Sequence, residues 1–122
     1  MKLTIFYDKD DIEFLFKFSP ISEEYFIEYM GYAVDSQWEP GSDSNFSEMI
    51  AHSENILLAL SPKSSDSKWV AYVLGYASGK DLNSHIYSTE ESVPQWSSVF
   101  KLSRTMDDLI EYYKYYNDKW FE

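Results

Sequence analysis

The 122-residue chain contains no cysteine. This absence excludes disulfide bonds, thiolate catalysis and zinc held by cysteine ligands. It also fits a reducing compartment, so we expect a cytoplasmic protein. The N-terminal apolar run ends at Asp8 and is too short for a secretory leader or a membrane span. We therefore expect no membrane partner.

Glycine and histidine are also scarce, with four and two residues. No Gly-rich phosphate loop, HExxH pattern or GxSxG nucleophile elbow is present. His52 and His85 have no second histidine at ligand spacing, and we expect His52 to make a polar surface contact beside Glu48. Sequential acids such as Glu23 and Glu24 diverge in a strand or helix, unlike a glycosidase pair. We expect a protein that is not an enzyme and that holds no metal or cofactor.

Basic residues are few, at 10 against 21 acidic residues, and the net charge is −11. This balance opposes binding to nucleic-acid phosphates. The excess lies in residues 1–62, which hold twelve acids and three bases, whereas residues 63–122 hold nine and seven. Crowded like charges destabilise a fold, so the first half is a candidate surface for a basic partner. A simple solubility role explains the overall charge equally well.

Aromatic residues, by contrast, make up 19% of the chain. Together with a length of 122 residues they predict one domain, spanning 1–122, with a core that needs no disulfide or metal.

The first half predicts a β-hairpin followed by two helices. Residues 2–7 and 12–18 have strand patterns, and apolar residues alternate with period two in the second run. Ser19-Pro20 then opens a helix, in which Phe26, Tyr29, Met30 and Ala33 recur at helical spacing. A turn at Pro40-Gly41 precedes a second helix that begins near Phe46 and is capped by Asp43 or Ser44.

The second half predicts strands and one long helix. Residues 55–60 fit either a helix or a buried strand, and the following Ser61-Pro62 favours the strand. Residues 69–76 are predicted to form the neighbouring strand, in which Gly75 indicates a bulge or a close backbone approach. Residues 85–88 and 97–102 are weaker strand candidates.

Thr105, with Asp108 three residues later, opens an amphipathic C-terminal helix. The predicted fold is therefore α+β, a single domain. It has a largely antiparallel sheet with an N-terminal β-hairpin, two acidic helices in the first half and this C-terminal helix.

The acid-rich region also contains an aromatic residue in a polar loop, Trp38. This side chain either packs into the core or, if exposed, serves as a hot spot ringed by carboxylates. The candidate partner-binding residues are Glu23, Glu24, Glu28, Asp35, Trp38, Glu39, Asp43 and Glu48. Whether these acids share one face is left open by the sequence.

A short, acidic, cysteine-free and aromatic-rich chain resembles the immunity proteins that bacteria pair with toxins. Val99-Phe100-Lys101-Leu102, running into the helix from Thr105 to Tyr116, is similar to the close of the SMI1/KNR4-like (SUKH) immunity family. Residues 21–26 resemble that family's early helix. The resemblance implies an inhibitor that neutralises a basic toxin, such as a nuclease, by covering it with carboxylates.

Other functions remain open. Carboxylates arranged along a ridge would mimic nucleic acid and block a DNA-binding enzyme. Aromatic residues lining a pocket would make a small ligand-binding module. The oligomeric state is not predicted.

Overall fold

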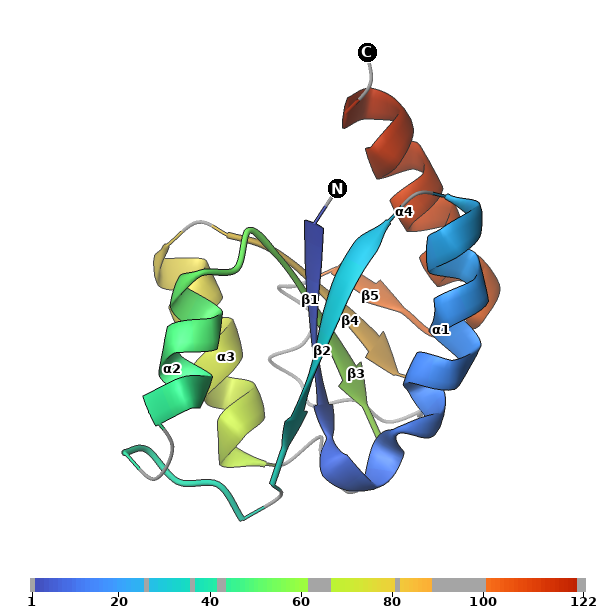
Figure 1. Cartoon of the computed structure of the whole chain (residues 1–122). Helices are drawn as coiled ribbons and strands as arrows, with labels where there is room; N and C mark the ends of the chain where they lie inside the picture. Colours follow the sequence, from blue (N-terminus) through green and yellow to red (C-terminus); the bar gives the residue numbers. More distant parts are fainter. Residues whose placement is uncertain are drawn as a thin grey trace.

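A computed structural model of the chain is shown in Figure 1. The structure describes residues 2–25, 27–35, 37–41, 44–61, 67–80, 82–88 and 101–120. Its strands are β1 (Lys2–Asp8), β2 (Glu28–Val34), β3 (Asn55–Leu60), β4 (Asn83–Ser88) and β5 (Lys101–Ser103). They form one sheet in the order β2-β1-β3-β4-β5, and every pairing is parallel. The fold is α/β, so the predicted α+β class with a largely antiparallel sheet is wrong.

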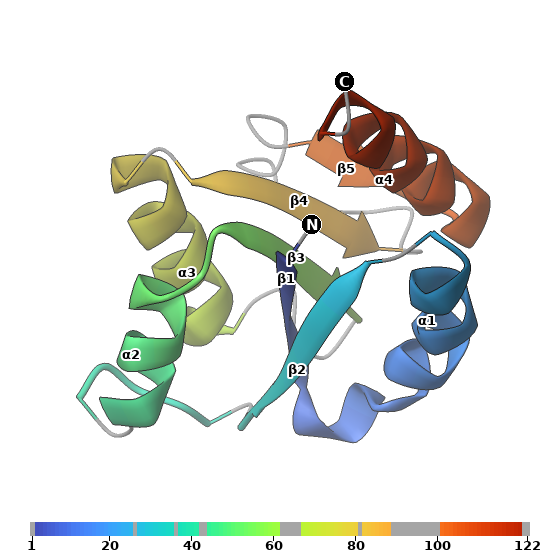
Figure 2. The ribbon, with the colours of Figure 1, turned by 45° about the horizontal axis from the view of Figure 1, so that its top comes forward.

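Helices cover both faces of the sheet. They are a 3₁₀ turn η1 (Lys9–Asp11), α1 (Glu13–Glu24), α2 (Ser44–Ala51), α3 (Lys68–Gly79) and α4 (Met106–Trp120). Figures 1 and 2 show α1 and α4 on one face and α2 and α3 on the other. The chain moves outward from β1 to β2 and then returns past β1 to β3. Because parallel crossovers keep one hand, this reversal places α1 and α2 on opposite faces.

The predicted N-terminal hairpin does not form, because residues 13–24 are helical. An alternating pattern also contains pairs four residues apart, which a helix stacks on one side. Phe14 and Phe18 are such a pair and pack into the core with their rings stacked 5.8 Å apart. Residues two apart on a helix point about 200° from each other. Ile12 and Phe16, which each lie two residues before a member of that pair, therefore face solvent.

The first predicted helix extends too far, since residues 28–34 form strand β2. Tyr29 contacts Phe18 on α1, with ring centroids 5.5 Å apart. A Cβ atom on Gly31 would lie 2.8 Å from Leu15 Cδ1, so the absence of a side chain lets α1 approach the strand closely. The start of this helix at Ser19-Pro20 is also wrong, because both residues lie inside α1.

Residues 69–76 are likewise helical, inside α3, and not a strand. The buried residues of α3 follow helical spacing: Trp69, Val70, Val73, Leu74 and Ala77. Their aromatic and β-branched content imitates a strand, but it reflects a helix that buries a wide apolar face. Gly75 lies on the exposed side and marks no bulge.

Other predictions are confirmed. Residues 55–60 form β3, buried along its whole length because both faces are covered. Residues 85–88 belong to β4, and 101–102 of the range 97–102 belong to β5, whereas 97–100 lie outside the described residues. The C-terminal helix begins with the expected cap, in which the Asp108 N–H donates to Thr105 Oγ1 over 3.1 Å.

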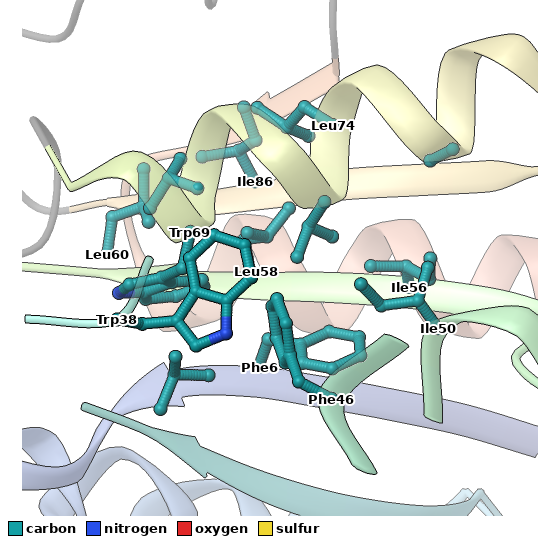
Figure 3. Close-up of a cluster of buried hydrophobic side chains, with 14 residues drawn as sticks. Phe6, Trp38, Phe46, Ile50, Ile56, Leu58, Leu60, Trp69, Leu74 and Ile86 are labelled. Carbon is teal, nitrogen blue, oxygen red and sulfur yellow. The ribbon is translucent and has the colours of Figure 1, made fainter. Parts of the chain in front are cut away.

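The larger core lies between the sheet and helices α2 and α3 (Figure 3). Trp38 packs there against Phe46 and Tyr72, with ring centroids 4.9 and 5.0 Å apart. Phe46 meets Phe6 of β1 edge-on at 5.5 Å. These aromatic contacts fasten the segment after β2 to the body of the domain.

Replacing Gly75 by alanine tests the helical assignment of residues 68–79. No atom lies within 4 Å of a Cβ built at Gly75, so the methyl group meets no obstacle. Alanine is favoured over glycine inside a helix by about 1 kcal/mol, so Gly75→Ala should stabilise the protein by that amount in urea unfolding. Gly79→Ala, at the helix end, is the control with a smaller gain. A destabilised Gly75→Ala protein would contradict the helix.

Candidate partner-binding surface

The chain turns from β1 into α1 at the carboxyl edge of the sheet. Asp8, the last residue of β1, is fully buried, and its Oδ1 accepts a hydrogen bond of 3.1 Å from the Asp10 N–H. This contact caps η1, which leads directly into α1. Asp10, Asp11 and Glu13 consequently cluster at the start of α1, where the helix dipole favours negative charge.

The outer side of α1 presents an apolar ridge to solvent, formed by Ile12, Phe16 and Pro20. These residues are four apart and lie in line on the helix. Ile12 is 47% exposed and Phe16 70% exposed, and Pro20 is also exposed. Proline has no N–H, so Pro20 cannot donate the usual helical hydrogen bond to the Phe16 carbonyl. The ridge therefore combines two large exposed apolar side chains, Ile12 and Phe16, with an exposed proline.

Acidic residues flank both ends of this ridge. Residues 10–28 hold six acids and one base, Lys17. Glu23 and Glu24 are exposed in the last turn of α1, which contains no basic residue. Carboxylates at a helix C-terminus oppose the helix dipole and cost about 0.3–1 kcal/mol each. Their position is unfavourable for the helix itself.

A cavity of about 210 Å³ lies beside the first turn of α1. It sits at the carboxyl ends of β3 and β4, next to the point where the strand order reverses between β1 and β3. Open parallel sheets bind ligands at such reversal points. Its lining residues are Asp10, Asp11, Glu13, Phe14, Lys17, Ala59, Leu60, Ser61 and Tyr87.

The sequence-predicted acids do not share one face. Glu23, Glu24 and Glu28 are exposed at the amino end of β2. Asp35 and Glu39 follow its carboxyl end, about 20 Å away along a seven-residue strand. Glu48 is exposed on α2, on the opposite face of the sheet from α1. Asp43 lies outside the described residues.

Two of these acids instead form ion pairs with lysines. Lys9 Nζ lies 3.0 Å from Asp35 Oδ2, and Lys68 Nζ lies 3.0 Å from Glu39 Oε1. The Gln37 N–H and Lys9 together hold the pKa of Asp35 below its usual value. Both pairs are exposed, so each contributes little to stability. The two lysines therefore partly neutralise the predicted acidic surface near the carboxyl end of β2.

Trp38 packs into the core, which is the first of the two placements predicted for it. It is only 5% exposed, inside the core against α2 and α3. A side chain this deeply buried offers almost no area to a partner. Among the residues that the structure describes, the exposed aromatic residue near the acids is Phe16. The strand prediction for residues 12–18 hides this residue. If the same residues are placed on a helix with one face buried, Phe16 falls on the exposed face.

The two histidines occupy different environments. His52 Nδ1 lies 2.8 Å from the Glu48 carbonyl oxygen on the surface, which confirms the expected polar contact. His85 is buried, stacked on Tyr112 at 4.1 Å, with Nε2 2.7 Å from Ser103 Oγ. Burial, with nearby Lys101, lowers the pKa of His85 to about 4. His85 is thus neutral at pH 7 and helps join α4 to the sheet.

The described residues include no group of three or more histidine, cysteine or acidic side chains placed to hold a metal ion. In the same part of the chain, no helix is long and apolar enough to cross a membrane. Comparison with family models, curated proteins and solved structures finds no match to this chain.

The lowered pKa of His85 predicts a loss of stability in mild acid. Between pH 6.5 and about 4, the unfolded chain binds a proton at His85 that the folded protein does not. Unfolding therefore becomes easier as the pH falls, by about 2 kcal/mol at pH 5 relative to pH 7. Urea unfolding at both pH values measures this loss.

His85→Gln should remove most of that difference, because glutamine does not titrate, while His52→Gln on the surface should retain it. Equal pH dependence in wild type and His85→Gln would contradict the prediction.

Proposed function

We propose that this chain is a cytoplasmic binding protein that docks a basic protein partner on α1, around the ridge of Ile12, Phe16 and Pro20. The supporting observation is the 70% exposure of Phe16 between two groups of carboxylates. Neutralisation of a toxin by an immunity protein is the form of activity that this arrangement serves best. Binding alone achieves it, and no reaction is assigned to the chain.

The charge distribution indicates that the partner is positively charged. Residues 10–28 carry six acids against one base, in a chain of net charge −11. A basic partner is attracted over a Debye length and associates faster than a neutral one. A second copy of this chain carries the same −11 and is repelled. The partner is therefore a different, basic protein.

The ridge supplies the short-range part of the interaction. Exposed phenylalanine gains binding free energy when a partner removes it from water, and aromatic anchors inside a polar rim are typical of interface hot spots. Ile12 and Phe16 place two large, exposed apolar side chains next to each other, four residues apart at the start of α1. Phe16 takes the anchoring role that the sequence had suggested for Trp38.

The acids at the end of α1 support the same proposal. Glu23 and Glu24 lie where the helix dipole disfavours them, and no basic residue of the last turn offsets them. An unfavourable placement that the fold does not require is consistent with a use in binding.

Phe16→Ala should weaken binding while leaving the fold intact. Retention of proteins from the native host at low salt, with this chain immobilised, measures the effect. A basic protein retained by the wild type should bind at least tenfold more weakly, because a hot-spot truncation costs about 2 kcal/mol or more. Unfolding free energy should change by less than about 0.5 kcal/mol, since the side chain is exposed.

Met30→Ala is the matched control, because Met30 is also large, apolar and 54% exposed, but lies on β2. It should leave binding unchanged. Equal retention by wild type and Phe16→Ala would refute docking on α1. If duplex DNA also competed for the retained protein, nucleic-acid mimicry would replace the proposal.

Glu23→Lys combined with Glu24→Lys should change stability and binding in opposite directions. Each lysine favours the negative end of the helix dipole, so the free energy of unfolding should rise by about 1 kcal/mol in total. Association with the basic partner should slow several-fold, and its salt dependence should weaken. Stopped-flow association and urea unfolding measure the two effects. Unchanged association at low salt would count against the steering role.

A further inference from the structure

The cavity at the carboxyl edge borders the ridge on α1. Glu13 and Lys17 line the cavity, and each directly follows a residue of the ridge, Ile12 or Phe16, in the sequence. Figure 1 shows α1 beginning at the end of the sheet where β3 and β4 finish. A partner that covers Phe16 and extends past Glu13 and Lys17 would therefore also reach the cavity.

The lining has an apolar floor and an acidic rim. Phe14, Ala59 and Leu60 are buried and form the floor together with the ring of Tyr87, whose centroid lies 5.0 Å from that of Phe14. Asp10, Asp11 and Glu13 supply carboxylates. Asp11 Oδ2 is inaccessible to solvent and has no hydrogen-bond partner among the described residues. A ligand in the cavity would therefore meet the exposed carboxylates of Asp10 and Glu13, and would reach Asp11 Oδ2 only if that side chain turned toward it. Donor groups on the ligand match these acceptors.

The volume limits what can enter. At about 210 Å³ the cavity is smaller than the roughly 300–1,000 Å³ typical of pockets for drug-sized ligands. It suits a single side chain better than a cofactor. A guanidinium group matches this lining, because it stacks on aromatic rings and donates two parallel hydrogen bonds to a carboxylate. Its aliphatic stem would lie against the apolar floor.

We propose that this cavity receives an arginine side chain of the partner that docks on the ridge. The inference deepens the proposed function and rests on it for the identity of the partner. Phe16 supplies the apolar anchor on the outside of α1, and the arginine supplies a charged anchor at its first turn. Two anchors on adjoining sides of one helix fix the orientation of the partner as well as its affinity.

A metal ion fits the cavity less well. The ammonium of Lys17 belongs to the lining and repels a divalent ion, whereas a long arginine side chain can place its charge away from it. The aromatic floor offers a metal no ligands.

Nuclear magnetic resonance titration with Nα-acetyl-arginine amide at constant ionic strength tests the proposal. Amide signals of residues 10–17, 59–61 and 87 should shift and saturate, with a Kd on the order of 1 mM for so small a ligand. The double variant Asp11→Asn with Glu13→Gln should bind at least tenfold more weakly. Lys17→Gln should bind more tightly, because it removes a like charge. Glu48→Gln, on α2, should match the wild type.

Three results would overturn the arginine site. They are shifts spread over all acidic surfaces, equal binding by the double variant and wild type, and displacement of the amide by millimolar magnesium chloride from the same residues. Tighter binding of Nα-acetyl-lysine amide would reassign the cavity to lysine and overturn the guanidinium argument.

The two proposals fail separately. Loss of partner retention in Phe16→Ala without amide binding overturns the arginine site alone. Amide binding in the cavity, with partner retention indifferent to Phe16, overturns docking on the ridge and leaves the cavity's preference for arginine supported.

Discussion

The parallel arrangement of the five described strands is the constraint on which the other features depend. Parallel strands need crossover connections, so helices cover both faces of the sheet and the central strand β3 is buried along its whole length. The same constraint brings every strand's carboxyl end to one edge. The acids that follow β1 therefore meet the ends of β3 and β4, although nearly fifty residues of sequence separate Asp11 from Ala59.

Much of the local structure is readable from the sequence, but the topology is not. Residues 55–60 and the cap at Thr105 are confirmed, because short buried strands and helix caps leave local signals. Residues 12–18 and 69–76 were assigned to strands because aromatic and β-branched residues favour both strands and helices with a wide buried face. Without helices at these positions, no crossover connections are predicted between neighbouring strands. The predicted sheet is therefore largely antiparallel.

The candidate surface shows the same limit. Charge counting correctly indicated an acidic first half, but the strand order divides those acids between the two ends of β2, and two of them pair with lysines. Trp38 is buried because α2 and α3 lie over it, which no local pattern near residue 38 reveals. Phe16 becomes the exposed aromatic residue only once residues 13–24 are known to be helical. The predicted fold class is wrong and Phe16 is missed for one reason, because residues 13–24 and 68–79 are helical.

Strand β2 lies at the margin of the sheet, so one side of its backbone has no neighbouring strand among those described. Such margins invite pairing between chains, and proteins guard against it with charge. In this chain the protection comes mainly from the overall negative charge, because Glu28 is the only charged residue of β2. The isoelectric point near 4.4 means that mild acid removes the repulsion between copies. Purification and storage should stay well above that pH, where the copies keep their like charge and repel each other.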